Sequence, residues 1–221
     1  MRNRNKLICG VGINDANYDV VKHEKVDNRS KTVWKCPYYK KWKGMLVRCY
    51  SKKHQEKCPT YIGCSVYEEW LTFSNFRKWM ETQDWEGMHL DKDFLVDGCK
   101  VYSPSTCIFI PQKLNSFILA SGKTRGQYPL GVMYMKKAKD MVNEYSKPYV
   151  SRVSNQTGKM FYLGVYSTPK EAHQIYLIEK LKQCGEYLTE FKNQPLIVKG
   201  LTRIYDKIKH HIDNNLELIS F

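Results

Sequence analysis

Apolar residues recur at helical spacing in two stretches of the first half of the chain. The first stretch predicts a helix from Tyr38 to Tyr50. Its apolar stripe consists of Tyr39, Trp42, Leu46 and Cys49. The second predicts a helix from Ser65 to about Gln83, which Ser65 and Glu68 would open as a capping box. Its stripe consists of Val66, Trp70, Phe73, Phe76 and Met80. We expect both stripes to form core, since an aromatic stripe at this spacing usually does.

Shorter apolar runs in the middle of the chain predict two strands followed by a helix. The first strand extends from Met88 to Leu95 and is followed by a tight polar loop with a turn at Asp97-Gly98. The second strand, Cys107 to Ile110, leads through a proline into a helix that carries Asn115 and ends near Ala120. The pattern therefore predicts a strand, a turn, a strand and a helix that presents an amide.

The N-terminal residues are more polar. Met1 to Lys6 form a basic arm, and Leu7 to Ile13 is predicted to be a short strand interrupted by two glycines. Residues 22–31 mix charged and small polar side chains, which indicates an exposed loop.

The C-terminal part predicts three strands and two helices, after a linker at residues 121–126. The strands are expected at residues 131–135, 148–153 and 160–165, with a hairpin turn at 155–158 between the last two. A helix follows from Thr168 to Cys184; Thr168 and Glu171 form a second capping box, and a proline stands at its first position. The last helix, around Ile197 to Ile212, has basic residues beside its apolar stripe, so it could pack on the sheet or face a nucleic-acid backbone.

Composition and charge narrow the class of protein. Of the 221 residues, 42% are hydrophobic and 13% aromatic, which is too much for a disordered chain. There is no apolar run long enough to span a membrane and no apolar segment typical of a signal peptide, so we expect a cytoplasmic protein. The net charge of +14 divides equally between residues 1–122 and 123–221. The natural partner is a polyanion, and nucleic acid is the commonest one in a cytosol.

Basic residues are densest between Lys35 and Lys57, where eight of them accompany a single acid, Glu56. The polar face of the predicted helix carries Lys40, Lys41, Lys43 and Arg48. Such a face can simply be solvated. Its clustering beside aromatic residues favours contact with phosphates, which positions a protein on a backbone without reading sequence.

Eight cysteines occupy positions 9, 36, 49, 58, 64, 99, 107 and 184. In a cytosol they stay reduced. The four at positions 36, 49, 58 and 64 could together bind zinc, but their spacing fits no established zinc finger or knuckle. We therefore expect small buried apolar side chains and no zinc.

The run His89-Leu90-Asp91-Lys92-Asp93 and the later pattern Tyr-Ser-Pro-x-x-Cys-x-Phe-x-Pro-x-x-x-Asn, which ends at Asn115, carry a resemblance. Together they resemble the ββα-metal core of phage HNH endonucleases, in the variant where an Asp-basic-Asp run replaces the usual Asp-His. The resemblance covers roughly residues 8 to 120. Its flanks include Gly10-Val11-Gly12-Ile13-Asn14-Asp15, Trp42 to Tyr50, Pro59-Thr60-Tyr61, Gly63-Cys64-Ser65-Val66 and Glu69-Trp70.

The resemblance implies that Asp91 and Asn115 bind Mg²⁺ or Mn²⁺, ions that take hard oxygen ligands. The family's general base follows the metal-binding Asp, and here that position is Lys92. His89 is the alternative base, because it shares a strand face with Asp91 and its ordinary pKa suits the role. Asp93 lies on the same face and could bind metal or orient a water. Taken singly, the two aspartates could be exposed acids at a strand end and Asn115 a surface amide.

The second half carries a resemblance of its own, in the runs Leu130-Gly131-Val132, Tyr149-Val150-Ser151-Arg152-Val153, Tyr162-Leu163-Gly164-Val165-Tyr166 and Thr168-Pro169-Lys170-Glu171-Ala172. They are similar to the plant ethylene-response-factor DNA-binding domain, whose three-stranded sheet lies in the major groove. The matching contact positions are Tyr134, Lys136, Tyr149, Ser151, Arg152 and Tyr162. Among them Arg152 is suited to a bidentate guanine contact, although it could equally be a surface arginine.

The expected fold is thus α+β, with an N-terminal arm and strand (1–34), a ββα-metal nuclease core with flanking helices (35–122), a three-stranded antiparallel sheet plus helix (123–190) and a basic helix (191–221). The expected function is a homing-like HNH endonuclease that nicks one strand of double-stranded DNA per active site. It would act as a monomer or a DNA-induced dimer, in the cytoplasm of a bacterial host. The alternative is a catalytically inactive DNA-binding protein, such as a repressor, on the same scaffold. The aromatic signature of RNA-recognition sheets is absent.

Overall fold

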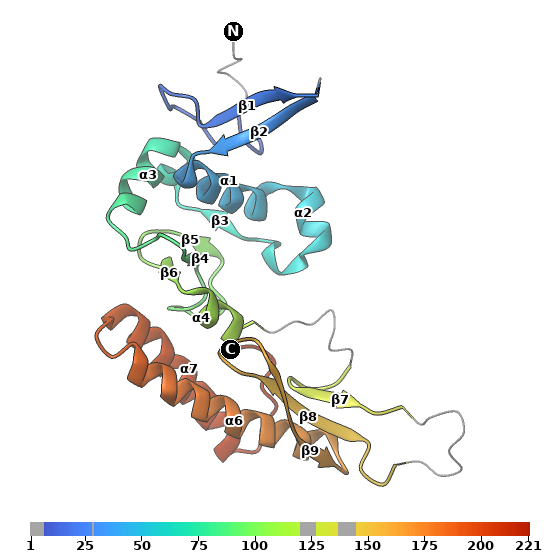
Figure 1. The fold of residues 1–221 in the computed structure, drawn as a ribbon. Coiled ribbons are helices and arrows are strands. Elements are labelled where there is room, and N and C mark those ends of the chain that lie inside the picture. Colours follow the sequence, from blue (N-terminus) through green and yellow to red (C-terminus); the bar gives the residue numbers. More distant parts are fainter. Residues whose placement is uncertain (1–6, 28, 120–126, 137–144) are drawn as a thin grey trace. The chain divides into compact units, whose positions relative to one another are not determined.

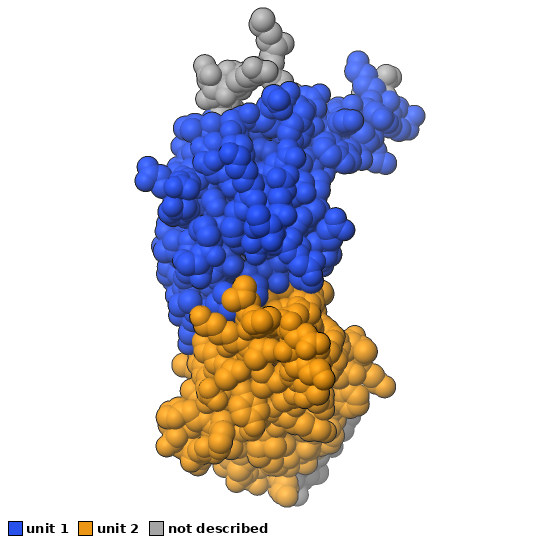
Figure 2. Space-filling view, turned by 90° about the vertical axis from the view of Figure 1, so that its left-hand side faces the viewer, with its two compact units in different colours: residues 1–109 blue, residues 110–221 orange. Residues whose placement is uncertain are grey.

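The chain divides between Phe109 and Ile110 into two units, residues 1–109 and 110–221, and each is described by itself (Figures 1 and 2). The computed structural model describes residues 7–27, 29–119, 127–136 and 145–221. The basic arm Met1 to Lys6 and the linker at 121–126 lie outside them. The architecture mixes helices with small sheets and includes one three-stranded antiparallel sheet. No helix in the described ranges is long and apolar enough to cross a membrane.

The core of the first unit is built on α1, Pro37–Tyr50, which confirms the first predicted helix. Its apolar stripe is buried, and Trp42 donates a hydrogen bond from its indole nitrogen to the carbonyl of Trp70 at 2.7 Å. Two short turns of helix follow, α2 (Lys52–Lys57) and η1 (Pro59–Tyr61). The prediction that this aromatic stripe forms core is confirmed.

The prediction of one helix from Ser65 to Gln83 is wrong in its first third. Residues Ser65–Val66 form β3, then come η2 (Glu68–Leu71) and α3 (Phe73–Glu81). β3 pairs in parallel with β5 (Val101–Tyr102), and the backbone N–H of Ser65 donates to the carbonyl of Lys100 at 2.8 Å. Pairing with a distant strand thus overrides the local capping-box signal, although every residue of the predicted stripe is still buried.

Two N-terminal predictions are also wrong. Leu7 to Ile13 is a tight turn, in which Cys9 and Gly10 have φ values of 52° and 80° and Ile8 bridges Gly12. Most of residues 22–31, predicted as loop, belong to the antiparallel strands β1 (Val21–Val26) and β2 (Arg29–Lys35). The cross-strand hydrogen bonds of this hairpin leave no trace in the apolar pattern.

The predicted strand–strand–helix order is present around residue 100. β4 (His89–Asp91) pairs with β6 (Ile108–Ile110), and α4 (Gln112–Phe117) follows. β4 is shorter than predicted and ends at Asp91. α4 also ends before Ala120. The boundary between the units falls just before α4, which belongs to the second unit.

The second unit confirms its predicted elements. β7 (Val132–Tyr134), β8 (Tyr149–Ser154) and β9 (Met160–Tyr166) form an antiparallel sheet in that order. α6 (Pro169–Glu190) starts with the predicted capping box and extends beyond Cys184. α7 (Pro195–Asp213) packs against α6, and the apolar stripe of α7 is buried. The last helix therefore packs through its apolar face within the second unit.

Candidate functional site

The candidate site begins where β4 ends. The Oδ1 atom of Asp91 accepts hydrogen bonds from the backbone N–H groups of Asp93 and Phe94, at 2.8 and 2.7 Å, and these bonds turn the chain out of the strand. The Oδ2 atom accepts no hydrogen bond from any residue that the structure describes. One carboxylate oxygen of Asp91 therefore organises the loop, and the other remains available to a ligand.

The electrostatics of Asp91 suit a cation. Burial raises the pKa of this carboxyl, and the two backbone N–H donors oppose that shift only in part. A partly desolvated carboxylate is unfavourable without a counter-charge, so a divalent cation at Oδ2 would stabilise it.

Lys92 has a structural role. Its side chain is 5% exposed, and Nζ donates to Asp93 Oδ1 and Oδ2, at 2.7 and 2.6 Å, and to the carbonyl oxygen of Cys99. A lysine ammonium has three protons, and these three acceptors engage all of them. Lys92 and Asp93 therefore close the loop at residues 93–99. The side-chain position that the family resemblance assigns to the base is occupied by a loop anchor.

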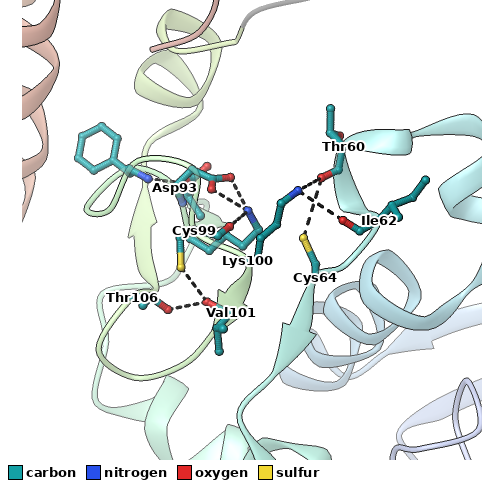
Figure 3. Close-up of polar contacts among 11 residues, drawn as sticks. Thr60, Ile62, Cys64, Asp93, Cys99, Lys100, Val101 and Thr106 are labelled. Atoms are coloured by element: carbon teal, nitrogen blue, oxygen red, sulfur yellow. Dashed lines mark hydrogen bonds and ion pairs between the residues drawn. The ribbon is translucent and has the colours of Figure 1, made fainter.

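The loop that Lys92 and Asp93 close is held at its C-terminal end as well (Figure 3). Lys100 reaches across to η1, where Nζ donates to the carbonyls of Thr60 and Ile62 at 3.0 and 3.4 Å. The carbonyl of Val101 accepts from the thiol of Cys99 at 3.3 Å and from the hydroxyl of Thr106 at 2.7 Å. These contacts hold both ends of the loop, so the carboxylate of Asp91 projects from a fixed backbone.

His89 remains as the candidate base. It stands two residues before Asp91 in β4, and strand alternation directs both side chains to one face. Burial lowers the pKa of His89, and the positive charges of Lys41 and Arg48 lower it further. The imidazole is consequently neutral at physiological pH and able to accept a proton.

Lys41 and Arg48 lie on α1, seven residues apart, and their charges reach the same site. Nζ of Lys41 donates to the carbonyl of Met88, next to His89. The guanidinium of Arg48 lies 5.2 Å from the ring of Tyr102 and 5.8 Å from that of Tyr61, and its Nε is buried without a hydrogen-bond partner in the described part of the chain. The positive charges of Lys41 and Arg48 beside His89 are suited to attract an anion such as phosphate.

The chain matches no protein-family model, no curated protein and no solved structure with which it was compared. The site is therefore interpreted from its own residues.

The remaining predicted residues of the candidate site lie on α1 and α4. Lys40 and Lys43 are exposed on α1, as expected for backbone contacts. Asn115 is half-buried on α4, where its backbone N–H donates to the carbonyl of Pro111 at 3.1 Å. Because Asp91 and Asn115 belong to different units, whose relative positions are not determined, their pairing at one metal stays a prediction. No group of three metal-binding side chains occurs in the described ranges.

The eight cysteines are free thiols. Those at positions 36, 49, 64, 107 and 184 are buried, which confirms the interpretation as apolar core for these five. Burial raises the pKa of Cys49, Cys107 and Cys184 to about 12 in each case, so their thiols stay protonated.

In the second unit, aromatic and basic side chains gather on the sheet. Tyr134 and Tyr149 are opposite each other in register with ring centroids 5.4 Å apart, and Tyr128 stacks on Tyr134 at 5.9 Å. Arg152 and Tyr162 are also opposite each other, and both are exposed. Lys136 is exposed as well. The predicted contact positions, except one, are thus at least partly accessible to a partner.

The exception is Ser151. It is fully buried and its hydroxyl has no hydrogen-bond partner in the described part of the chain, so the prediction that it contacts DNA conflicts with the structure. Successive side chains of a strand alternate between its two faces, so Ser151 points into the second unit while its neighbour Arg152 points outward.

Sequence reasoning missed the residues that surround Arg48. Tyr61 and Tyr102 both stand in runs that carry the HNH resemblance, but they are far apart along the chain, so no local signal places them around Arg48. Tyr128 could have been suspected from the concentration of tyrosines around the predicted sheet.

Proposed function

We propose that this protein is a metal-dependent DNA endonuclease of the HNH type that nicks one strand per active site. One observation carries the proposal: β4 ends at a carboxylate with an available oxygen, Asp91, two residues after His89, whose pKa is lowered by burial and by the charges of Lys41 and Arg48. Phosphodiester hydrolysis needs these groups together, since a base must activate water and positive charge must stabilise the phosphate. The resemblance to phage HNH cores supports the same interpretation.

Each residue has a distinct part in this proposal. His89 accepts the proton of the attacking water. Lys41 and Arg48 supply positive charge beside His89, which favours the approach of a phosphate. Asp91 would hold Mg²⁺ or Mn²⁺, with Asn115 as the second predicted ligand. The bound metal would supply charge stabilisation at the phosphate and the leaving oxygen.

The second unit would hold the enzyme on double-stranded DNA. Its sheet offers Arg152 for a base edge and Lys136 for the backbone, with the tyrosine cluster beside them. Sheets are an established means of reading a groove. A single site cuts one phosphodiester at a time, so an open circle is the expected first product from a supercoiled plasmid.

The competing function is a DNA-binding protein without catalysis. It is favoured by one observation, the use of Lys92 as a loop anchor where the family has its base. The two functions share DNA binding and differ in cleavage.

The test incubates purified protein with supercoiled plasmid in Mg²⁺ and in EDTA, and measures DNA retention in the same buffers. Asp91→Asn keeps an oxygen for the loop N–H groups and removes the charge, so nicking should fall at least about a hundredfold, more than the 10–100-fold typical of outer-shell changes. Asp84→Asn, at an exposed position, is the matched control. Retention of DNA without nicking by the wild-type protein in Mg²⁺ or Mn²⁺ would refute the nuclease and support the binding protein.

A further inference from the structure

β1 and β2 form a two-stranded ribbon that, among the residues the structure describes, packs on no other element along most of its length. Of its thirteen strand residues, Val21 alone is half-buried, and every other one is exposed. Opposite residues in register share a face, so one face carries Glu24–Lys31 and Val26–Arg29 and the other carries His23–Thr32 and Lys25–Ser30. Both faces of the ribbon are therefore open to solvent.

This ribbon is strongly basic. Its side chains include Lys22, Lys25, Arg29, Lys31 and Lys35, against two acids, Glu24 and Asp27. Trp34 is 41% exposed, and the ammonium of Lys22 lies 5.6 Å from its ring. A run of cations with few acids is suited to the phosphate backbone of a nucleic acid, and the exposed Trp34 ring lies beside these cations, where contact with the partner would cover it.

Stability also calls for a partner. A two-stranded hairpin with neither face covered is marginally stable in water. This one is attached to the core at its base, where the N–H of Cys36 donates to the carbonyl of Val20 at 2.9 Å and both residues are buried. The anchored base fixes the ribbon's direction, and its exposed strands keep their backbone edges and both faces for binding.

The dimensions fit a duplex groove. Two strands lie about 5 Å apart and six residues extend about 20 Å. The major groove of B-DNA is about 12 Å wide and admits a two-stranded ribbon, whereas the minor groove is about half that width. The positive charges on both faces would then lie opposite the two phosphate backbones that border the groove.

We propose that the β1–β2 ribbon inserts into the major groove of double-stranded DNA, as a contact separate from the candidate site and from the sheet of the second unit. The inference rests on the proposed function only in taking DNA as the partner. Figure 1 shows the ribbon on the far side of α1 from β4 and β6, so it would contact DNA away from the bond that is cut. Its role is to lengthen the recognised site.

The test compares two variants that lose equal charge. The ribbon variant carries Lys25→Gln, Arg29→Gln and Lys31→Gln. The control carries Lys78→Gln, Lys182→Gln and Lys192→Gln, at exposed positions elsewhere. Affinity for duplex DNA is measured over a salt series, with circular dichroism to confirm folding. Each lost phosphate contact lowers the salt slope by about 0.9, so the ribbon variant should lose about 2 to 3 and the control less than 1.

A second measurement avoids charge changes. Acrylamide quenching of tryptophan fluorescence is measured for the wild type and for Trp34→Phe, with and without DNA. The difference between the two proteins gives the accessibility of Trp34 to the quencher. We expect DNA to protect Trp34. A duplex whose cytosines carry bulky groups in the major groove should bind the wild type more weakly, and an RNA duplex should bind it poorly, because the major groove of RNA is deep and narrow.

Equal loss of slope in both variants, unprotected Trp34, or preference for the RNA duplex would each overturn the inference. So would a wild-type protein that does not bind DNA, and that result would remove the proposed function as well. Ribbon-dependent binding without any nicking would refute the nuclease alone and leave the inference standing.

Discussion

Lys180 is a buried amine whose replacement should change the pH dependence of stability. It lies on α6 and is 4% exposed. Its Nζ donates to the carbonyl of Phe117, the last residue of α4, at 2.6 Å, and it lies 3.5 Å from the ring of Phe117 and 4.8 Å from that of Phe221. Burial lowers the pKa of Lys180 to about 7, and nearby Cys184 opposes the shift only slightly.

The magnitude follows from linkage. Between pH 7 and pH 10.5 the unfolded chain binds a proton at this residue and the folded chain largely does not, so stability rises as the pH rises. Each pKa unit corresponds to about 1.4 kcal/mol, which sets an upper limit of about 5 kcal/mol over the whole range. From pH 7 to pH 9, with the folded amine half protonated at the start, the contribution is about 2 kcal/mol.

Lys180→Met keeps the volume and removes the titration. The free energy of unfolding is measured by urea denaturation at pH 7 and pH 9. Far-UV circular dichroism monitors the transition, since α6 and α7 are the longest helices described. Fluorescence reports the first unit separately, because all five tryptophans lie there. Lys182→Met, at an exposed position two residues on, is the control.

We expect the difference in unfolding free energy between wild type and Lys180→Met to change by about 2 kcal/mol between the two pH values, in favour of the wild type at pH 9. At both pH values the variant also leaves the carbonyl of Phe117 without its donor, a constant loss of about 1 kcal/mol that does not change the pH-dependent difference. Lys182→Met should follow the wild type. Parallel pH profiles for wild type and Lys180→Met would refute the reasoning, since they would mean that the amine is charged in the folded protein as it is in the unfolded chain.

Two further predictions concern the site and the sheet. Burial and the charges of Lys41 and Arg48 lower the pKa of His89, so the nicking rate should stay constant as the pH falls to about 6.5 and decline only below it. Initial rates measured at constant ionic strength test this. A decline that begins above pH 6.5 would argue against His89 as the base. Gly131 has φ +75°, and a Cβ there would lie 2.0 Å from the ring of Tyr176. Gly131→Ala should therefore lower the unfolding free energy of the second unit by at least about 2 kcal/mol in the same denaturation assay. An unchanged unfolding free energy would contradict the packing of α6 on β7.

The sequence by itself determined the elements whose signals are local. The apolar stripe of α1 and the Thr168–Glu171 capping box of α6 each depend on residues within one or two helical turns, and both are present as expected. The three strands of the second unit were also predictable, because a turn at residues 155–158 separates two apolar runs of strand length. In the site, the position of His89 and Asp91 on one face follows from strand alternation alone.

Tertiary structure decided everything that depends on a distant partner. Ser65 carries a good helix-start signal, yet pairing with β5 makes it a strand. Lys92 became a loop anchor because the carbonyl of Cys99 comes within its reach. Arg48 was predicted from its charge as a surface contact, and the rings of Tyr61 and Tyr102 place it inside, next to the candidate site.

The same reason explains the β1–β2 ribbon and Ser151. Hydrogen bonds between strands are made by the backbone, so a hairpin with two polar faces has no apolar periodicity to reveal it. Strand alternation puts Ser151 and Arg152 on opposite faces of β8, and the packing of α6 on the sheet decides which face is buried. Local patterns thus determine the elements of this protein, and the contacts between elements determine which polar residues can act.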